Sequence, residues 1–182
     1  MDRFLAWLRH RSPRAMAPVE RQPPQTRPQD ALKAFGRTIA SSVFVVTASD
    51  ADGEPNGATI SASVSLSLDP PLVLICLAHA SDTLAAIRQT GCFRLHVLAA
   101  GQDAVSQAFA GRRREAYSAH LDGVDQNGAP ALRNALAAAR CRVASEFSAG
   151  DHAIVVGALE DVSVTAAAPL IYHCGGYAAL AA

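Results

Sequence analysis

Several patterns that commonly carry chemistry are missing from this chain of 182 residues. Its cysteines form no CxxC pair, and none stands at zinc spacing from a histidine; they are Cys76, Cys92, Cys141 and Cys174. HExxH and HxH patterns are absent as well, so we expect no metal site. GxGxxG, GxSxG and Walker signatures do not occur either. Any nucleotide must therefore bind without a Rossmann domain, and we interpret the cysteines as reduced thiols that serve as small apolar side chains.

Net charge and long apolar runs are also absent. The 16 basic and 16 acidic side chains cancel, which argues against a nucleic acid or an anionic membrane as partner. No run approaches the roughly 18 apolar residues of a transmembrane helix. The apolar segment 4–8 is too short for a secretory signal, and arginines bound it. We therefore expect a soluble, cytoplasmic protein without an integral membrane segment.

The chain has two segments of different composition. Half of its residues are apolar and its mean hydropathy is slightly positive, which excludes disorder for the body. Residues 1–28 instead carry six arginines, two acidic residues and five prolines. We predict a flexible tail over 1–28 and one domain over 29–182. A short helix at 3–9, with the only tryptophan, remains open as a peripheral anchor or a docking peptide.

Hydrophobic periodicity predicts many strands and few helices. A first helix should begin at Asp30 and place Leu32, Phe35 and Ile39 on one face. Two further helices are expected, one capped by residues 81–83 and one over 102–109. Strands are expected at 42–47, 56–68, 72–77, 93–98, 140–147, 152–164 and 170–172, hairpin turns at 50–53 and 148–151, and a long loop at 118–130. Hairpin-like spacing favours a mainly β fold, an antiparallel barrel with helices covering its mouths.

The stretch 56–72 is the most distinctive part of the sequence. From Thr59 to Ser67 hydroxyl residues fill every odd position and apolar residues nearly every even one, until Pro70-Pro71 must end the strand. As one strand, the stretch would place its hydroxyls on a single uncharged face. Small hydroxyls let a flat ligand approach the backbone and offer it hydrogen bonds. An exposed strand with a serine-rich face is the alternative.

Here the residues resemble a known family. Gly57-Ala58-Thr59-Ile60-Ser61-Ala62, with Ser65-Leu66-Ser67-Leu68-Asp69-Pro70-Pro71-Leu72, is similar to the signature segment of the short-chain flavin reductases, the reductase components of two-component flavin-dependent monooxygenases. The resemblance runs from about Leu32 to about Leu180. It implies an FMN-binding split β-barrel, paired as a homodimer with flavin at the subunit interface.

The resemblance assigns a flavin site to several segments. Flavin needs donors at its pyrimidine edge, a wall for its ring and an anion site for its phosphate. A helix start suits the phosphate because its N–H groups and dipole favour an anion. Two departures from the family are His96, where asparagine is common and whose charge should depend on pH, and Ser63, where a bulky apolar residue is usual. The predicted cofactor-binding residues are Ala58, Thr59, Ile60, Ser61, Ala62, Cys76, Leu77, Ser81, Thr83 and His96.

A second set of residues is predicted to bind the nicotinamide nucleotide. Gly150-Asp151-His152 is a hairpin turn on physical grounds, and its histidine could be purely structural. In the resembled family this triplet is associated with nucleotide binding, so His152 becomes the candidate catalytic residue, orienting the nicotinamide. Tyr177 resembles part of the closing motif and would border the ring or the nicotinamide, with a core tyrosine as the alternative. Arg112-Arg113-Arg114 is either a solvated loop or a contact for the adenosine phosphates.

The sequence thus predicts an NAD(P)H:flavin oxidoreductase. It would transfer a hydride from NADH or NADPH to FMN or FAD, and release reduced flavin to a partner oxygenase. The alternative from another class is a non-catalytic or retained-cofactor flavin-binding protein, which would stay yellow during purification. A related split-barrel oxidase acting on a pyridoxal-type phosphate ranks lower, because Gly150-Asp151-His152 favours the reductases.

Overall fold

The computed structural model describes residues 27–111, 116–124, 128–178 and 180. The chain divides into two compact units, residues 1–35 and residues 36–182. The predicted tail helix at 3–9 and the arginines at 112–114 lie outside the described residues. The boundary expected at residues 28 and 29 stays a prediction. No helix in the described part of the chain is long and apolar enough to cross a membrane.

The helix α2 (Pro28–Arg37) matches the first predicted helix. Proline at its start is favourable because the first helical N–H has no intrahelical acceptor. Asp30 lies within the first turn and pairs with Arg27 at 2.9 Å, so it is not the cap residue that the sequence predicted. Ile39 lies beyond the end of the helix and is not part of its apolar face.

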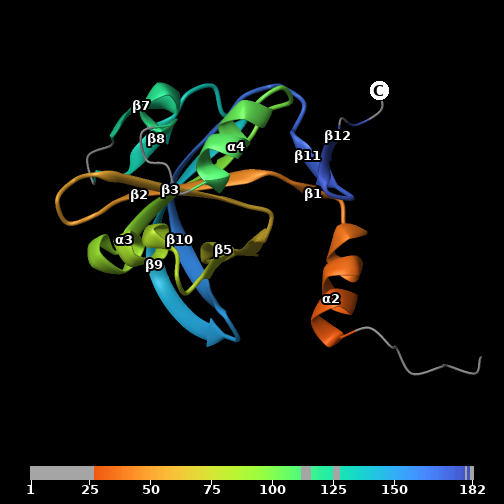
Figure 1. Cartoon of the computed structure of the whole chain (residues 1–182). Helices are drawn as coiled ribbons and strands as arrows, with labels where there is room; N and C mark the ends of the chain where they lie inside the picture. The colour runs from red at the N-terminus through yellow and green to blue at the C-terminus, as the bar shows by residue number, and fades with distance from the viewer. Residues whose placement is uncertain (1–26, 112–115, 125–127, 179, 181–182) are drawn as a thin grey trace, which may run out of the picture. The chain divides into compact units, whose positions relative to one another are not determined.

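Most of the second unit is one antiparallel sheet of seven strands, in the order β3-β2-β6-β9-β10-β5-β4 (Figure 1). The strands are β2 (Phe44–Ser49), β3 (Pro55–Ile60), β4 (Ser63–Leu68), β5 (Pro71–Ala78), β6 (Cys92–Val97), β9 (Ala137–Ala149) and β10 (His152–Val164). The mainly β prediction is confirmed, including the bounds of the strand at 152–164 and the hairpins at 50–53 and 148–151. Among the described residues no ladder joins the edge strands β3 and β4, so hydrogen bonding does not close the barrel.

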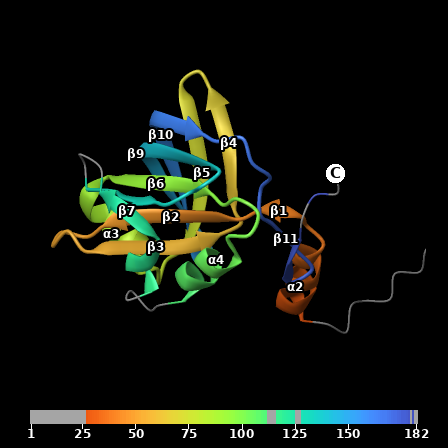
Figure 2. The same ribbon diagram turned by 90° about the horizontal axis from the view of Figure 1, so that it is seen from above.

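The serine-rich stretch is not one strand, which corrects the prediction. It breaks at Ser61 and Ala62 into β3 and β4, which lie at opposite edges of the sheet order (Figure 2). The carbonyl oxygen of Ala62 accepts a hydrogen bond from the N–H of Cys76 at 3.1 Å, and from there β4 pairs with β5. Alternation within each half was visible in the sequence, but the change of partner strand was not, because a side-chain pattern does not specify which strands pair.

Short strands complete the unit. The predicted strand at 42–47 is interrupted at Val43, leaving β1 (Ser41–Ser42) to pair with β11 (Ile171–His173), which pairs in turn with β12 (Gly176–Ala178). The prediction of a long loop at 118–130 is wrong, because this segment contains a 3-10 helix (Ser118–His120) and the strand β7 (Leu121–Val124). The strand β7 pairs with β8 (Pro130–Leu132).

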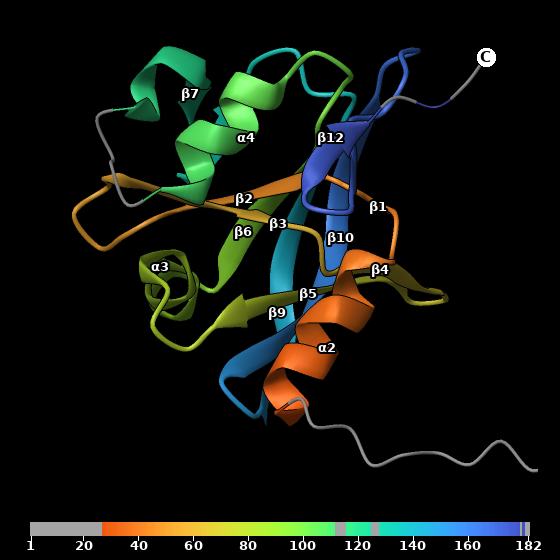
Figure 3. The ribbon, with the colours of Figure 1, turned by 45° about the vertical axis from the view of Figure 1, so that its right-hand side comes forward.

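The strands β2 and β3 pass between the helices α3 (Asp82–Thr90) and α4 (Asp103–Ala110), as Figures 1 and 3 show. Both helices agree with the sequence prediction, and each covers a separate buried cluster. Leu84 and Ile87 of α3 pack with Phe93 and Val155 of the sheet. Phe109 of α4 packs in a second cluster with Val45, Leu98, Leu132 and Leu170. Because β3 lies beside both helices, its residues can meet groups from each of them.

Candidate flavin and nucleotide site

The first pocket, of about 220 Å³, opens where β3, the start of α3 and the end of α4 meet. It brings together four of the predicted flavin residues: Ala58, Thr59, Ser81 and Thr83. The other residues around it are Asn56, Gly57, Ala78, Ala80, Asp82, Phe109, Ala110, Gly111 and Tyr117. Segments that are distant in the sequence therefore form one concave surface.

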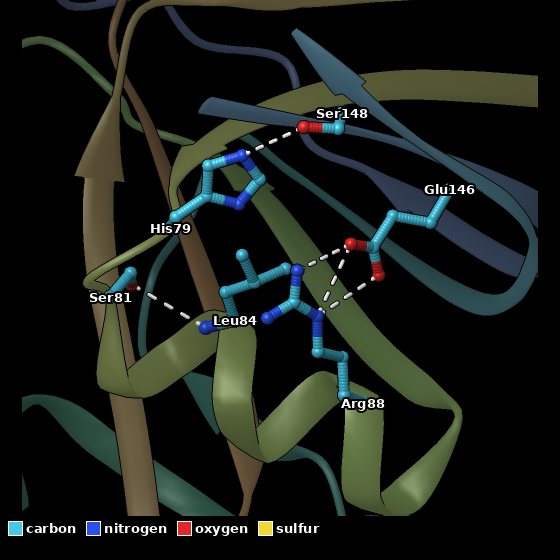
Figure 4. A network of polar contacts seen from close by, with 6 residues as sticks. All are labelled: His79, Ser81, Leu84, Arg88, Glu146 and Ser148. Carbon is cyan, nitrogen blue, oxygen red and sulfur yellow. Dashed lines mark hydrogen bonds and ion pairs between the residues drawn. The ribbon is translucent and has the colours of Figure 1, made fainter. Parts of the chain in front are cut away.

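The start of α3 provides hydrogen-bond donors at this pocket. Ser81 is the cap residue, with an extended backbone, and its Oγ accepts from the N–H of Leu84 at 3.4 Å (Figure 4). The N–H groups of Asp82 and Thr83 belong to the first turn, where a helix supplies no acceptor of its own. No lysine or arginine is among the described residues of the pocket. An anion here would be held by the helix start and by hydroxyls, beside the carboxylate of Asp82.

Edge geometry gives β3 free backbone groups. Among the described strands β3 pairs with β2 alone, and an edge strand presents N–H and C=O groups without ladder partners. Gly57 allows a close approach, because a Cβ at this position would lie 2.4 Å from Cδ1 of Phe109. The ring of Phe109 therefore packs directly on the strand backbone at Gly57, which is buried.

Two aromatic residues support this wall, and sequence reasoning missed both. The rings of Phe109 and Tyr117 stack with centroids 4.4 Å apart and an angle of 11° between their planes. The hydroxyl of Tyr117 lies 3.1 Å from the carbonyl oxygens of both Gly57 and Gly111. Phe109 was visible only as an apolar residue of a helix, and Tyr117 follows a loop, so neither had a periodic signal.

A second pocket, of about 210 Å³, adjoins the first and shares Thr59 and Ala110 with it. It brings the predicted residues Ile60 and Ser61 together with Tyr177. Val43, Ser106 and Tyr172 complete its lining. The rings of Tyr172 and Tyr177 meet edge to face, with centroids 5.7 Å apart. Residues 58–61 thus border two adjoining hollows along one strand.

The Gly150-Asp151-His152 triplet forms the turn between β9 and β10, with Gly150 at a φ of +63°. Nδ1 of His152 lies 2.7 Å from a carboxylate oxygen of Asp151, and this contact is the main reason that the pKa of Asp151 is lowered. Both side chains are exposed, and neither lines the first or the second pocket. However, His152 pairs with Ala78, which does line the first pocket.

The turn is tied to the loop before α3 by several contacts. The N–H of His79 donates to the carbonyl oxygen of Asp151 at 3.0 Å, and its Nε2 lies 3.1 Å from Oγ of Ser148 (Figure 4). Arg88 of α3 pairs with Glu146 of β9 at 2.6 Å, which lowers the pKa of the Glu146 carboxyl. The His79 contacts place the predicted nucleotide residues beside the segment that precedes α3, whereas the Arg88 pair lies at the last turn of that helix.

The structure does not bring His96 to either pocket. Its side chain is fully buried, with Nδ1 3.2 Å from the carbonyl oxygen of Val45. Nε2 accepts a hydrogen bond from the N–H of Leu132 at 3.1 Å, so the ring is neutral and carries its proton on Nδ1. Burial lowers the pKa of His96 to about 4. The pH dependence that the sequence predicted for the charge of His96 would therefore appear only in acid.

Three other predicted residues also lie away from both pockets. Leu77 is a core residue that is 2% exposed. Cys76 points to the other face of β5, and burial raises the pKa of its thiol. Ala62 is exposed at the break between β3 and β4. Ser63 lies in a third, apolar hollow, not in the two pockets along β3. Alternation along β5 places adjacent residues on opposite faces, so Cys76 and Leu77 cannot form one wall.

Comparison with known proteins agrees with this geometry. Residues 35–181 match the family model described as a flavin reductase like domain. The chain belongs to the flavin reductase family. An NADH-dependent flavin reductase from Rhodococcus is 35% identical to this chain. The match covers 86% of this chain and 89% of the Rhodococcus protein. The reductase component of 4-hydroxyphenylacetate 3-monooxygenase from Thermus thermophilus is 37% identical to this chain. The match covers 82% of this chain and 95% of the Thermus protein.

Solved structures confirm the fold of this flavin reductase family member. The flavin reductase component of a bacterial two-component tryptophan halogenase superposes with a TM-score of 0.77 at 31% identity, covering 84% of this chain and 98% of its own. An NADH:FAD oxidoreductase from Streptomyces globisporus, solved with NAD and FAD fragments, has a TM-score of 0.80 at 26% identity, with 87% and 98% covered.

Proposed function

We propose that this chain transfers a hydride from NADH to FMN or FAD and releases the reduced flavin. The observation that carries the proposal is the pair of adjoining pockets along the edge strand β3, one of which ends at the start of α3. Together they offer a partly exposed strand at residues 58–60 and donors for a phosphate. NADH is favoured over NADPH because the similar proteins whose names give a nucleotide are NADH-dependent.

Flavin, when bound, supplies the ring that accepts the hydride. The chain itself would bind and orient the reactants. Residues 58–61 would face the ring, and Ser81 and Thr83 would hold its phosphate. His152, held by Asp151, would orient the nicotinamide nucleotide from the adjacent turn. Close stacking of two cofactors provides most of the rate, so no acid or base is needed at the reacting carbon.

A second copy of the chain is proposed to cover the outer face of β4 and β5. Val64 of β4 is 53% exposed and Phe147 of β9 is 56% exposed, whereas Leu68 lies beyond a bulge that turns it to the other face. Val64 pairs with Leu74, so apolar side chains continue across neighbouring strands on this face. Sedimentation of the purified protein should give a dimer, and Val64→Glu should shift it to a monomer. A monomeric wild type would contradict this part of the proposal.

We propose that a separate oxygenase consumes the reduced flavin. Related proteins from Thermus thermophilus and Rhodococcus opacus are named as reductase components of monooxygenases. A cytoplasmic location fits this function, because NADH is an intracellular reductant and the four cysteines are free.

The decisive experiment measures NADH and NADPH oxidation by the purified protein with and without added FMN or FAD. We expect NADH oxidation that requires added flavin, and a colourless protein after purification. His152→Ala should raise the KM for NADH, with His120→Ala as a matched control outside both pockets. A folded protein that stays yellow and oxidises neither nucleotide would contradict the reductase function and favour a flavin-binding role.

A further inference from the structure

Ser106 of α4 makes two hydrogen bonds with two different atoms. Its carbonyl oxygen accepts from the hydroxyl of Thr59 at 2.7 Å, and its own Oγ accepts from the hydroxyl of Tyr177 at 2.9 Å. The side chain is 2% exposed, and the residue lines the second pocket. One buried residue is thus bonded both to the edge strand β3 and to the short strand β12.

These two partners line the same pocket from different elements. Thr59 belongs to the strand that offers its backbone to the ring, and Tyr177 belongs to the hairpin of β11 and β12. Figure 3 shows α4 with β3 below it and β12 beside it. Among the described strands β11 pairs only with β12 and β1, so the bond to Ser106 is a side-chain tie between this hairpin and α4.

The bond from Tyr177 fixes where its ring lies. A phenol has two rotatable torsions, and a hydrogen bond at the far end of the ring restricts both of them. The edge-to-face contact with Tyr172 restrains the other side of the ring. Loss of the Ser106 hydroxyl would leave the Tyr177 hydroxyl without this acceptor and would free the ring to turn into or away from the pocket.

We propose that Ser106 is a positioning residue of this pocket, which sets the Tyr177 ring against the ring of the bound cofactor or nucleotide. The inference rests on the proposed reductase function. It assigns to Ser106, which lines the second pocket, a role that acts through the Tyr177 ring. Hydride transfer depends steeply on the distance between the two reacting rings. A small movement of the Tyr177 ring should therefore lower turnover more than it lowers flavin affinity.

The test compares Ser106→Ala with Tyr177→Phe and with the double variant. Ser106→Ala keeps the carbonyl that holds Thr59, and alanine suits a helix, so the fold should persist. A neutral hydrogen bond contributes about 0.5–1.5 kcal/mol, so each single variant should lower kcat by roughly 2-fold to 10-fold. The double variant should be no worse than either single one, because both remove the same bond.

Two further variants separate positioning from a general effect. Thr59→Val removes the other bond of Ser106 and should weaken flavin affinity, measured by quenching of flavin fluorescence, whereas Ser106→Ala should leave that affinity within about 2-fold. Ser163→Ala, on the exposed end of β10, should leave every parameter unchanged.

Distinct outcomes would overturn the inference. Wild-type turnover in Ser106→Ala with a lowered melting temperature would show a structural role only. Additive losses in the double variant would show that the two side chains act separately. A wild-type protein that never oxidises NADH with flavin would instead overturn the reductase function itself, and with it this role for Ser106.

Discussion

The two predicted halves of the site differ in how firmly the chain holds them. The flavin side is built on buried groups: Asn56, Gly57 and Thr83 are all buried, and the stacked pair Phe109 and Tyr117 supports them. The nucleotide side is a turn whose residues 148–152 are all exposed. Its polar contacts face water, where each contributes little to stability. The comparison indicates a preformed surface for flavin and an adaptable one for the nucleotide.

The comparison predicts its largest effect at Gly57. In Gly57→Ala the added Cβ would lie 2.4 Å from Phe109, so the aromatic pair must shift. Overpacking of this kind costs about 1–3 kcal/mol, and flavin affinity should fall by about 10-fold to 100-fold because Phe109, which must shift, lines the first pocket. Flavin titration and thermal unfolding measure both effects.

Gly157→Ala is the matched control, because its Cβ would lie 2.5 Å from Phe93 in the core, away from both pockets. It should lower stability comparably and leave flavin affinity of the folded protein unchanged. Equal losses of affinity in both variants would contradict a preformed flavin surface at Gly57.

Acid should destabilise the body of the protein through His96. The pKa of this residue is near 4 in the folded state and about 6.5 in the unfolded chain, so the unfolded state binds the extra proton. Stability from the neutral ring is complete above pH about 6.5 and is lost as pH falls toward 4, at up to about 1.4 kcal/mol per pH unit.

Chemical denaturation at pH 7 and at pH 5 measures this loss. His96→Gln should be less stable at pH 7, because the backbone groups of Val45 and Leu132 lose their fitted partner. The variant should also lose less stability between the two pH values than the wild type. An equal decrease in both proteins would show that other groups cause the acid sensitivity.

On the exposed side, His152→Ala should raise the KM for NADH by about 10-fold, corresponding to about 1.4 kcal/mol. Flavin affinity should not change, because His152 lines neither pocket. Asp151→Asn should have a smaller effect of the same kind, since it keeps a hydrogen-bond acceptor for Nδ1 of His152. A fall in flavin affinity in either variant would contradict the proposal that the turn binds the nucleotide and the two pockets bind the flavin.

The smallest effect is expected at the ion pair of Arg88 and Glu146. This pair is partly exposed, so Glu146→Gln should change stability by less than about 1 kcal/mol. Any change in the KM for NADH should be within about 2-fold, and addition of salt should reduce the difference between variant and wild type. A large effect would show that the turn is held as firmly as the flavin pocket.

Local features of this protein were readable in its sequence. The cap at Ser81, the hairpin at residues 148–151 and the strand over 152–164 follow from residue type and spacing, because caps and turns depend on neighbouring residues. The motif around Thr59 also indicated the family correctly. The sequence therefore determined these local elements and the segment that borders the pockets.

Only the tertiary structure decided which residues share a surface. The burial of His96 between β2 and β8 and the packing of Phe109 over Gly57 depend on partners more than 30 residues away. The break at Ser61 depends on β2 and β5, which pair with β3 and β4. The two bonds of Ser106 reach Thr59 and Tyr177, 47 and 71 residues distant. Side-chain periods specify a face of a strand or helix, but the partner of that face depends on how the strands pair and the helices pack.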